Sequence, residues 1–194
     1  MGRAPASEER ILAGARRALD RHGWQRITVE RIAAEADVSR VTLHRRGLTK
    51  DAILARLAEQ ATERYREAMW PVLTAPEPAG DRLVTALGVL CDLAEENLSL
   101  LLALDAQANA QIFHTTDREE ALTRDVFTEP LERLLRDGVN EGAIRSAGDP
   151  IETATVLFNL VGWTYIHLRS GHGWRPVRAR RATLELALHG LLRD

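Results

Sequence analysis

Hydrogen-bonding side chains that suit nucleic acid are concentrated between residues 40 and 50 of this 194-residue chain. Arginine, threonine, histidine and lysine recur there at short intervals, at Arg40, Thr42, His44, Arg45, Arg46 and Lys50. Side chains of these types can donate to phosphate oxygens and to the edges of bases in a DNA groove. The stretch therefore predicts a surface that binds nucleic acid.

Two short helices are expected to position these side chains. Thr28 can cap a helix that has an apolar stripe on one face. That helix should stop at Asp37, because aspartate tolerates the left-handed backbone that a sharp turn needs. Ser39 can then cap a second helix from Arg40 to about Arg46. Two short helices joined by a tight turn form a helix-turn-helix, whose second helix enters the major groove.

The same segment and the helix before it carry small, apolar and capping residues at fixed offsets. They are Ile11, Leu12, Ala15, Gly23, Thr28, Val29, Ile32, Ala33, Ala36, Val38, Ser39, Thr42, Leu43, Lys50, Asp51 and Leu54. With this pattern, residues 8–57 resemble the DNA-binding domain of TetR-type transcriptional regulators. Four positions depart from the residues usual in that family. Asp37 replaces a turn glycine, Val41 a small residue or proline, His44 a tyrosine, and Gly47 an aromatic or branched residue.

The resemblance implies a role for most of the donors. The matching family positions assign phosphate contacts to His44, Arg46 and Lys50. Arg45 can serve either a phosphate or a base. Side chains near the start of the recognition helix reach base edges, so we expect base contacts from Arg40 and Thr42. The two capping residues, Thr28 and Ser39, complete the predicted DNA-binding set.

Charge is divided unevenly along the chain. Residues 1–50 hold 11 Arg or Lys against 6 Asp or Glu, a net charge of +5, and residues 51–194 hold 15 against 22, a net charge of −7. Residues 1–50, which we call the head, are basic, and the remaining residues are acidic. This division indicates that only the head binds a polyanion. The single Cys91 cannot form an intrachain disulfide, and no apolar run reaches membrane-spanning length. We therefore expect a cytoplasmic protein with no membrane partner.

The rest of the chain has the pattern of helices, without sustained β alternation. Start and stop signals predict helices over residues 50–73, 81–97, 99–113, 116–141, 149–169 and 177–192, with Pro130 interrupting the fourth. The predicted fold class is all-α. An N-terminal three-helix helix-turn-helix DNA-binding domain is expected over residues 1–50, and a C-terminal helical ligand-binding and dimerisation domain over residues 51–194.

The helix expected over residues 149–169 is apolar around its circumference, and such a helix needs a second partner to bury it. In TetR-type proteins the last two helices form a four-helix bundle with a second copy, so the resemblance implies a homodimer. The residues predicted for its interface are Leu157, Val161, Gly162, Leu184 and Leu188. The alternative is a helix buried centrally within one subunit.

The helix expected over residues 99–113 carries two polar residues, Asp105 and Asn109, on a stripe that is otherwise apolar. A carboxylate that faces a core is costly unless it is paired or solvated in a cavity, so this pair indicates a small-molecule effector site. The predicted site comprises Trp70, Leu101, Asp105, Asn109, Phe113, Phe127 and Trp163. The alternatives are an ion pair with an arginine, or a helix rotated so that Asp105 faces water.

The sequence contains few residue patterns that would indicate a catalytic site or a metal site. None of the six histidines has another at the spacing of four residues that places two ligands on one helical face. No phosphate-binding glycine loop or nucleophile elbow is present. Cys91 lies on an apolar stripe that is typical of a buried thiol. We therefore predict that the protein is not an enzyme and has no catalytic residues, no metal site and no cofactor.

The sequence favours a homodimeric transcriptional repressor that a small-molecule effector releases from a palindromic operator in double-stranded DNA. Two alternatives belong to other classes. One is an orphan or architectural helix-turn-helix protein without an effector, which a solid C-terminal core would favour. The other is a helical enzyme or small-molecule-binding protein with a vestigial head, which an absence of DNA affinity would favour.

Overall fold

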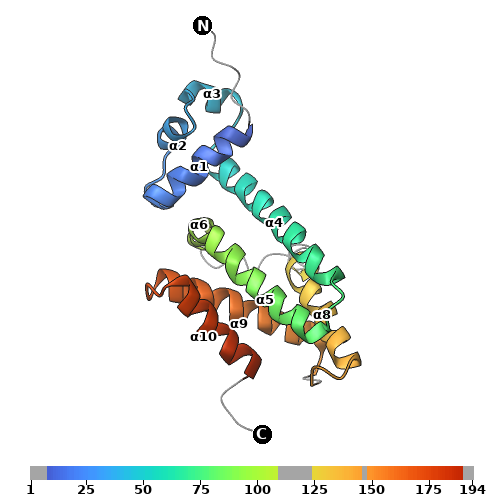
Figure 1. The fold of residues 1–194 in the computed structure, drawn as a ribbon. Helices are drawn as coiled ribbons and strands as arrows, with labels where there is room; N and C mark the ends of the chain where they lie inside the picture. Colours follow the sequence, from blue (N-terminus) through green and yellow to red (C-terminus); the bar gives the residue numbers. More distant parts are fainter. Residues whose placement is uncertain (1–7, 109–123, 146–147, 190–194) are drawn as a thin grey trace. The chain divides into compact units, whose positions relative to one another are not determined.

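The computed structural model of the chain describes residues 8–108, 124–145 and 148–189 (Figure 1). Within these ranges the regular elements are all helices and no strand is present, which confirms the predicted all-α class. The described residues divide into two compact units, one of residues 8–62 and 99–108, the other of residues 63–98, 124–145 and 148–189. In the same ranges, no helix combines the length and apolarity that a bilayer span requires.

The first unit contains α1 (Glu8–His22), α2 (Val29–Glu35), α3 (Arg40–Arg45), the start of α4 (Lys50–Thr74) and most of α6 (Leu98–Ala108). Their apolar faces share one core, which includes Ile11, Leu12, Ala15, Leu19, Ile32, Leu43, Ile53, Leu54, Leu57, Leu100 and Ala103. The three-helix head predicted from the sequence is therefore confirmed. The unit also takes in the first half of α4 and most of α6, beyond the boundary predicted at residue 50.

A close approach between α1 and α2 fixes how these helices pack. Gly14 is buried in α1, and a Cβ atom placed on it would lie 2.5 Å from the Cα atom of Ala36. That separation is far below ordinary van der Waals contact, so the two backbones meet closely because position 14 lacks a side chain. The sequence pattern alone did not single out Gly14.

The second unit contains the end of α4, α5 (Ala79–Glu96), a π-helical turn η2 (Arg124–Thr128), α8 (Glu129–Asn140), α9 (Pro150–Ser170) and α10 (Pro176–His189). Helix α5 packs against α8, α9 and α10. The predicted start of α9 is confirmed, since the Asp149 carboxylate accepts a hydrogen bond from the Ile151 N–H at 2.9 Å. Pro130 lies in the first turn of α8, where a proline costs no helical hydrogen bond.

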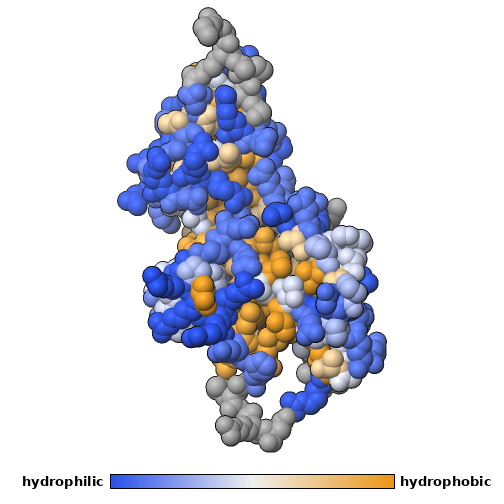
Figure 2. Space-filling model, in the orientation of Figure 1, coloured by the Kyte–Doolittle hydropathy of each residue, from blue (hydrophilic) through white to orange (hydrophobic). Residues whose placement is uncertain are grey.

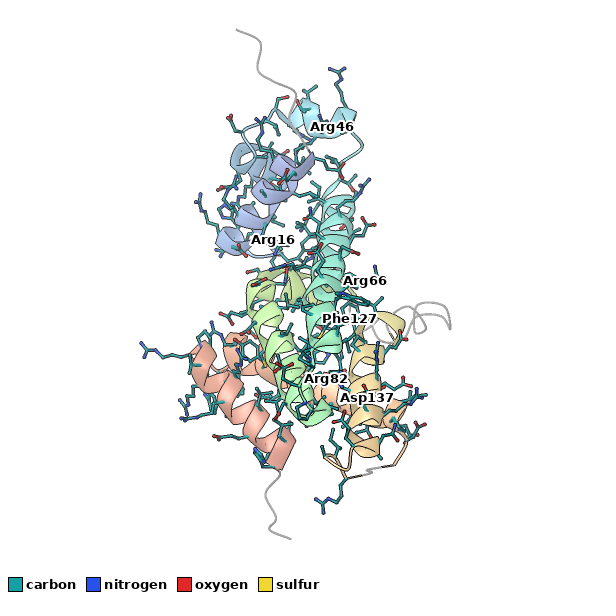
Figure 3. All side chains as sticks on the ribbon, turned by 45° about the vertical axis from the view of Figure 1, so that its right-hand side comes forward. Arg16, Arg46, Arg66, Arg82, Phe127 and Asp137 are labelled. Carbon is teal, nitrogen blue, oxygen red and sulfur yellow. The ribbon has the colours of Figure 1, made fainter. Side chains whose placement is uncertain are left out.

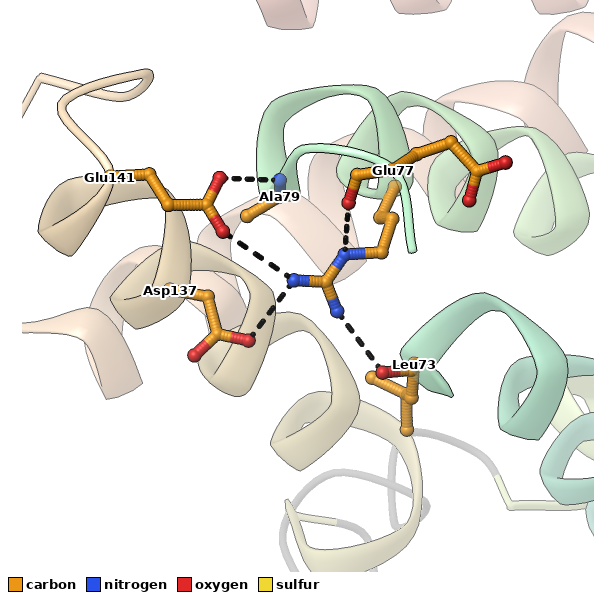
Figure 4. A network of polar contacts seen from close by, with 6 residues as sticks. Leu73, Glu77, Ala79, Asp137 and Glu141 are labelled. Carbon is orange, nitrogen blue, oxygen red and sulfur yellow. Dashed lines mark hydrogen bonds and ion pairs between the residues drawn. The ribbon is translucent and has the colours of Figure 1, made fainter. Parts of the chain in front are cut away.

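Two polar networks join the helices of the second unit. Arg82, whose side chain is 10% exposed, donates to the carbonyl oxygens of Leu73 and Glu77, both at 3.0 Å, and to Asp137 at 3.3 Å (Figure 4). Glu141 lies 3.8 Å from the same guanidinium and also accepts from the Ala79 N–H at 2.7 Å. The end of α4, the start of α5 and the end of α8 therefore meet at one arginine.

The second network joins α5 to α9. Arg169 donates to both carboxylate oxygens of Glu95 at 2.6 Å, and the Tyr165 hydroxyl donates to Glu95 at 2.9 Å. The hydrogen bonds from Arg169 and Tyr165 and the charge of Arg169 lower the pKa of Glu95, which outweighs the opposing effect of its burial. A bidentate pair of this kind adds geometric specificity to the packing of two helices.

Candidate DNA-binding surface

The hydroxyl groups of Thr28 and Ser39 begin the two helices of the helix-turn-helix. Thr28 accepts from the Arg31 N–H at 3.3 Å, and Ser39 accepts from the Thr42 N–H at 3.1 Å. Both residues have extended backbone torsions at these caps, as predicted. Their hydroxyls therefore already have partners within the head, and a contact of either residue with DNA stays a prediction.

Helix α2 ends in a left-handed turn at Asp37, which has a φ of 54°. The Val38 N–H donates to the Ala33 carbonyl at 2.9 Å, and the Asp37 N–H donates to the Ala34 carbonyl at 3.2 Å. These two bonds form a Schellman motif, and Val38 packs against the head core. The left-handed conformation predicted for Asp37 is confirmed.

Helix α3 ends in the same motif, with Gly47 at a φ of 66°. The Leu48 N–H donates to the Leu43 carbonyl and the Gly47 N–H to the His44 carbonyl, both at 3.0 Å. Leu48 packs against the head core in the position that Val38 occupies after α2. The departure from the family at position 47 thus has a physical reason. Glycine supplies the left-handed turn, and the next residue closes the core.

Four cationic or potentially cationic side chains of this segment face solvent. Leu43 is fully buried, whereas Arg40, His44, Arg45 and Arg46 are exposed. Figure 3 labels Arg46 at the end of α3. This arrangement agrees with the predicted exposure of the donors, although the partner of each on DNA stays a prediction.

Arg40 has a neighbour that the sequence did not reveal. Its Nε atom lies 3.1 Å from Glu30 Oε1, and both side chains are more than half exposed. The pKa of Glu30 is lowered, first by a hydrogen bond with its own backbone, then by the Thr28 hydroxyl, and least by the charge of Arg40. The ion pair places the Arg40 guanidinium beside α2 while leaving the side chain exposed, and a contact of Arg40 with a base stays a prediction.

Thr42 and Lys50 are less accessible than predicted. Thr42 is half-buried, and its hydroxyl lies 2.8 Å from that of Ser39. Lys50 donates to the Trp24 carbonyl at 2.8 Å, and its Nζ atom lies 3.8 Å from the centre of the Trp24 ring. Lys50 therefore ties the first turn of α4 to the segment after α1, a role that its sequence position did not indicate.

The comparisons with known proteins agree with this geometry. Residues 11–57 match the sequence model of the family described as "Bacterial regulatory proteins, tetR family". This match identifies residues 11–57 as a DNA-binding domain of the tetR type. A search of curated protein sequences finds no match.

Solved structures of TetR-type regulators share the fold of the whole chain. The FadR transcriptional regulator from Bacillus subtilis, solved with stearoyl-CoA, has a TM-score of 0.72 at 18% identity, covering 96% of this chain and 100% of that one. The MbdR regulator from Azoarcus sp. CIB has a TM-score of 0.72 at 23% identity, covering 95% and 98%. Thermus thermophilus FadR, solved with lauroyl-CoA, has a TM-score of 0.63 at 20% identity, covering 97% of each.

The expectation that Asp105 faces a core is wrong. Its side chain is exposed, and the face of α6 that packs into the first unit carries Leu100, Ala103 and Leu104. Leucine occurs on several sides of this helix, so the apolar pattern leaves its rotation open, and the core selects a different stripe from the predicted one. Leu101 is half-buried. Asn109 and Phe113 lie outside the described residues.

The described aromatic residues of the predicted effector site, Trp70, Phe127 and Trp163, lie in the second unit, whereas Asp105 and Leu101 belong to the first. Trp70 is 66% exposed, which contradicts its expected place in an enclosed wall. Phe127 is half-buried, with its ring centre 5.1 Å from that of Tyr65 and 5.6 Å from that of Phe158. Tyr65 also donates to the Phe127 carbonyl at 2.9 Å. Phe127 is labelled in Figure 3. Trp163 is half-buried beside His167.

Two of the residues predicted for the dimer interface face the interior of the subunit. Val161 is 0% exposed, and Gly162 is buried, with the nearest side-chain atom, from Leu90 of α5, 4.0 Å from the position of a Cβ. Their prediction as interface residues is therefore wrong. Helix α9 is apolar on every side, so sequence periodicity cannot say which side meets α5.

Other apolar residues of α9 and α10 remain accessible, and Figure 2 shows hydrophobic surface on the second unit. Val156 and Leu160 are exposed on α9, and Leu157, Leu184 and Leu188 are half-buried. A shallow, open hollow of about 440 Å³ lies on one face of α10, where it is lined by Val177, Arg180, Arg181, Leu184, Glu185, Leu188 and His189. We call this surface of α10 the α10 groove.

The remaining reactive groups are structural. Cys91 is buried, and its burial raises the pKa of the thiol to about 12, as expected for a thiol that packs as a small apolar residue. Within the part of the chain that the structure describes, no three His, Cys, Asp or Glu side chains are grouped so as to hold a metal ion.

Proposed function

We propose that the chain is a cytoplasmic dimeric repressor that binds a palindromic DNA operator and is released from it by a small molecule. The observation that carries the DNA-binding part is the exposure of Arg40, His44 and Arg45 on α3 and of Arg46 at its C-cap, on a TetR-type domain in which Leu43 is buried. A helix with this exposure, capped at both ends, suits insertion into a major groove.

Selection of DNA from a random pool with the purified full chain tests this part. We expect a palindromic sequence whose half-sites lie about one helical turn apart, or a multiple of it. Arg46→Ala should weaken binding to all sequences and reduce the slope of log affinity against log salt by about one per half-site. Arg64→Ala, which removes an exposed arginine from the second unit, serves as the control and should change neither value.

The proposal of a dimer is supported by the α10 groove. Leu184 and Leu188 provide an apolar floor, while Arg181 and Glu185 lie one helical turn apart on the same face. A second copy related by a two-fold axis can place each Arg181 opposite the partner's Glu185, so the surface is complementary to itself. Many TetR-type proteins dimerise through their last two helices, and the exposed residues Val156 and Leu160 extend the apolar surface onto α9.

The proposal of an effector is supported by similar proteins and by the aromatic cluster Tyr65, Phe127 and Phe158 of the second unit. Two similar structures, those of the FadR regulators from Bacillus subtilis and Thermus thermophilus, were solved in complex with stearoyl-CoA and lauroyl-CoA. The π-helical turn that carries Phe127 is a rare conformation that recurs at functional sites. We infer an apolar ligand that contacts Phe127.

Release of the chain from its operator on addition of a ligand tests this inference. Lauroyl-CoA and stearoyl-CoA are the first probes, added to the chain bound to its selected operator, with free coenzyme A as the control for the head group. Release by the acyl forms and not by coenzyme A supports an apolar effector site. If neither acyl-CoA releases the operator or raises the melting temperature, the acyl-CoA assignment fails and the DNA-binding assignment stands.

A further inference from the structure

One apolar side chain on the recognition helix α3 lies outside the core of the first unit. Of the large apolar residues between 8 and 62, Val41 is the one that the structure leaves exposed, at 64%. It is the second residue of α3, between exposed Arg40 and half-buried Thr42. Leu43 supplies the contact of α3 with the head core. Packing therefore does not explain a valine at this position.

The other properties of position 41 also argue against a structural role. Valine is β-branched and is less favourable in a helix than alanine, leucine or the long polar residues. An exposed valine leaves apolar surface in water until a partner covers it. The two neighbouring side chains already have polar partners, because the Thr42 hydroxyl is bonded to Ser39 and Arg40 Nε is paired with Glu30. The start of α3 thus presents one apolar side chain next to exposed Arg40.

The floor of the major groove offers one matching partner. Guanine, adenine and cytosine present donors and acceptors there, whereas thymine also presents its C5-methyl group. A valine side chain has no hydrogen-bonding atom, so the methyl group is the feature of a base edge that it can recognise. We propose that Val41 is a specificity-determining residue that contacts the methyl group of a thymine in each operator half-site. This inference rests on the proposed function, since it requires α3 to enter the major groove.

Replacing thymidine by deoxyuridine removes only the C5-methyl group of the base, so it tests this contact directly. After an operator has been selected with the full chain, each thymine of one half-site is replaced in turn by deoxyuridine, with the symmetric thymine replaced in the other half-site. The duplexes are titrated with the wild-type chain and with the Val41→Ala variant. Val41 is exposed, so this substitution should leave folding intact. Val139→Ala, on an exposed valine of α8, is the matched control.

We expect one symmetric pair of replacements to weaken wild-type binding by about three- to tenfold per half-site, as removal of a buried methyl contact predicts. The same pair should have less than half that effect on the Val41→Ala variant, whose shorter side chain does not reach the methyl group. The Val139→Ala chain should behave as wild type. A double-mutant cycle isolates this coupling from any general loss of affinity.

Two negative outcomes are distinguishable. If a palindrome is selected but no thymine-to-deoxyuridine replacement depends on Val41, the inference is overturned while the proposed function stands. If no DNA sequence is enriched at all, the proposed function fails and the inference fails with it.

Discussion

The two units of this protein differ in how many of their large apolar side chains are exposed to solvent. The first unit collects the apolar faces of α1 to α4 and of α6 into one core, and of its large apolar side chains the structure leaves Val41, at 64%, and Leu102, at 37%, exposed. The second unit leaves Val156, Leu160 and Val177 exposed on its last two helices. Figure 2 shows hydrophobic surface on the face of this unit that is in view. A closed core can carry a charged binding surface by itself, whereas an open apolar surface needs a partner.

The largest expected effect is therefore on assembly. Replacing Leu184 and Leu188 together by glutamate places charges on the floor of the α10 groove. We expect the dimer dissociation constant to rise at least about 1000-fold, roughly 4 kcal/mol, because unpaired charges cannot be buried against an apolar surface. Analytical ultracentrifugation measures this change. An unchanged dimer would show that the second unit uses another surface.

The charges that border the groove sharpen this test. Arg181→Glu and Glu185→Arg should each weaken the dimer, because each places like charges opposite one another across the two-fold axis. The double variant restores opposite charges and should recover most of the lost affinity. Additive losses in the double variant would reject the proposed register while leaving the groove itself as the interface.

The second prediction concerns the closed core of the first unit. Gly14→Ala should destabilise the head by about 2–3 kcal/mol, because the added methyl group overlaps the backbone of Ala36 and forces α1 and α2 apart. Ala13→Gly on the exposed side of α1 is the control, with an expected loss of about 1 kcal/mol from helix propensity alone. Urea denaturation of both variants gives the comparison. A loss at Gly14 no larger than at Ala13 would mean that the close approach relaxes easily.

The sequence predicted the ends of the helices better than their rotation and their tertiary contacts, for a physical reason. Helix caps such as Thr28, Ser39 and Asp149 act within a few residues, so local sequence specifies them. The rotation of α6 and α9 about their own axes depends on the whole core, because both helices are apolar on several sides. Asp105 and Val161 were misplaced for this reason. The contacts of Lys50 with Trp24 and of Arg40 with Glu30 depend on tertiary structure and leave no local signal.

Where the first unit relies on apolar packing, the second also relies on the pair Glu95–Arg169. Glu95→Gln should cost about 2 kcal/mol, less than for a fully buried pair because both side chains are partly exposed. Since the folded-state pKa of Glu95 is lowered, its contribution is complete above the unfolded-state pKa and is lost as the pH falls through the folded-state pKa. Thermal melts at neutral and acidic pH should therefore show the difference between Glu95→Gln and wild type shrinking in acid. A constant difference would contradict this account.

The fourth prediction concerns the turn that closes α3. Gly47→Ala should cost the head about 1–2 kcal/mol, because an L side chain is disfavoured at a φ of 66° even though no atom lies within 4 Å of the added Cβ. Gly47→Asp should cost less, since aspartate tolerates the left-handed region and occupies it at position 37. Guanidinium denaturation distinguishes these outcomes, and equal costs for alanine and aspartate would mean that backbone conformation is not what selects glycine here.

The smallest expected effect lies in the matching turn after α2 and has the opposite sign. Asp37→Gly should stabilise the head by about 0.5 kcal/mol, because glycine adopts a φ of 54° without strain but loses more conformational entropy on folding than aspartate. The two turns share the same hydrogen bonds, with Val38 and Leu48 in equivalent places, so they differ mainly in the residue that bears the positive φ. Asp37→Ala keeps the strain without the short polar side chain and should destabilise the head. Denaturation midpoints in the order glycine, aspartate, alanine would show that the strain resides in the backbone. A glycine variant less stable than wild type would show instead that the Asp37 side chain makes a net favourable contribution to the turn.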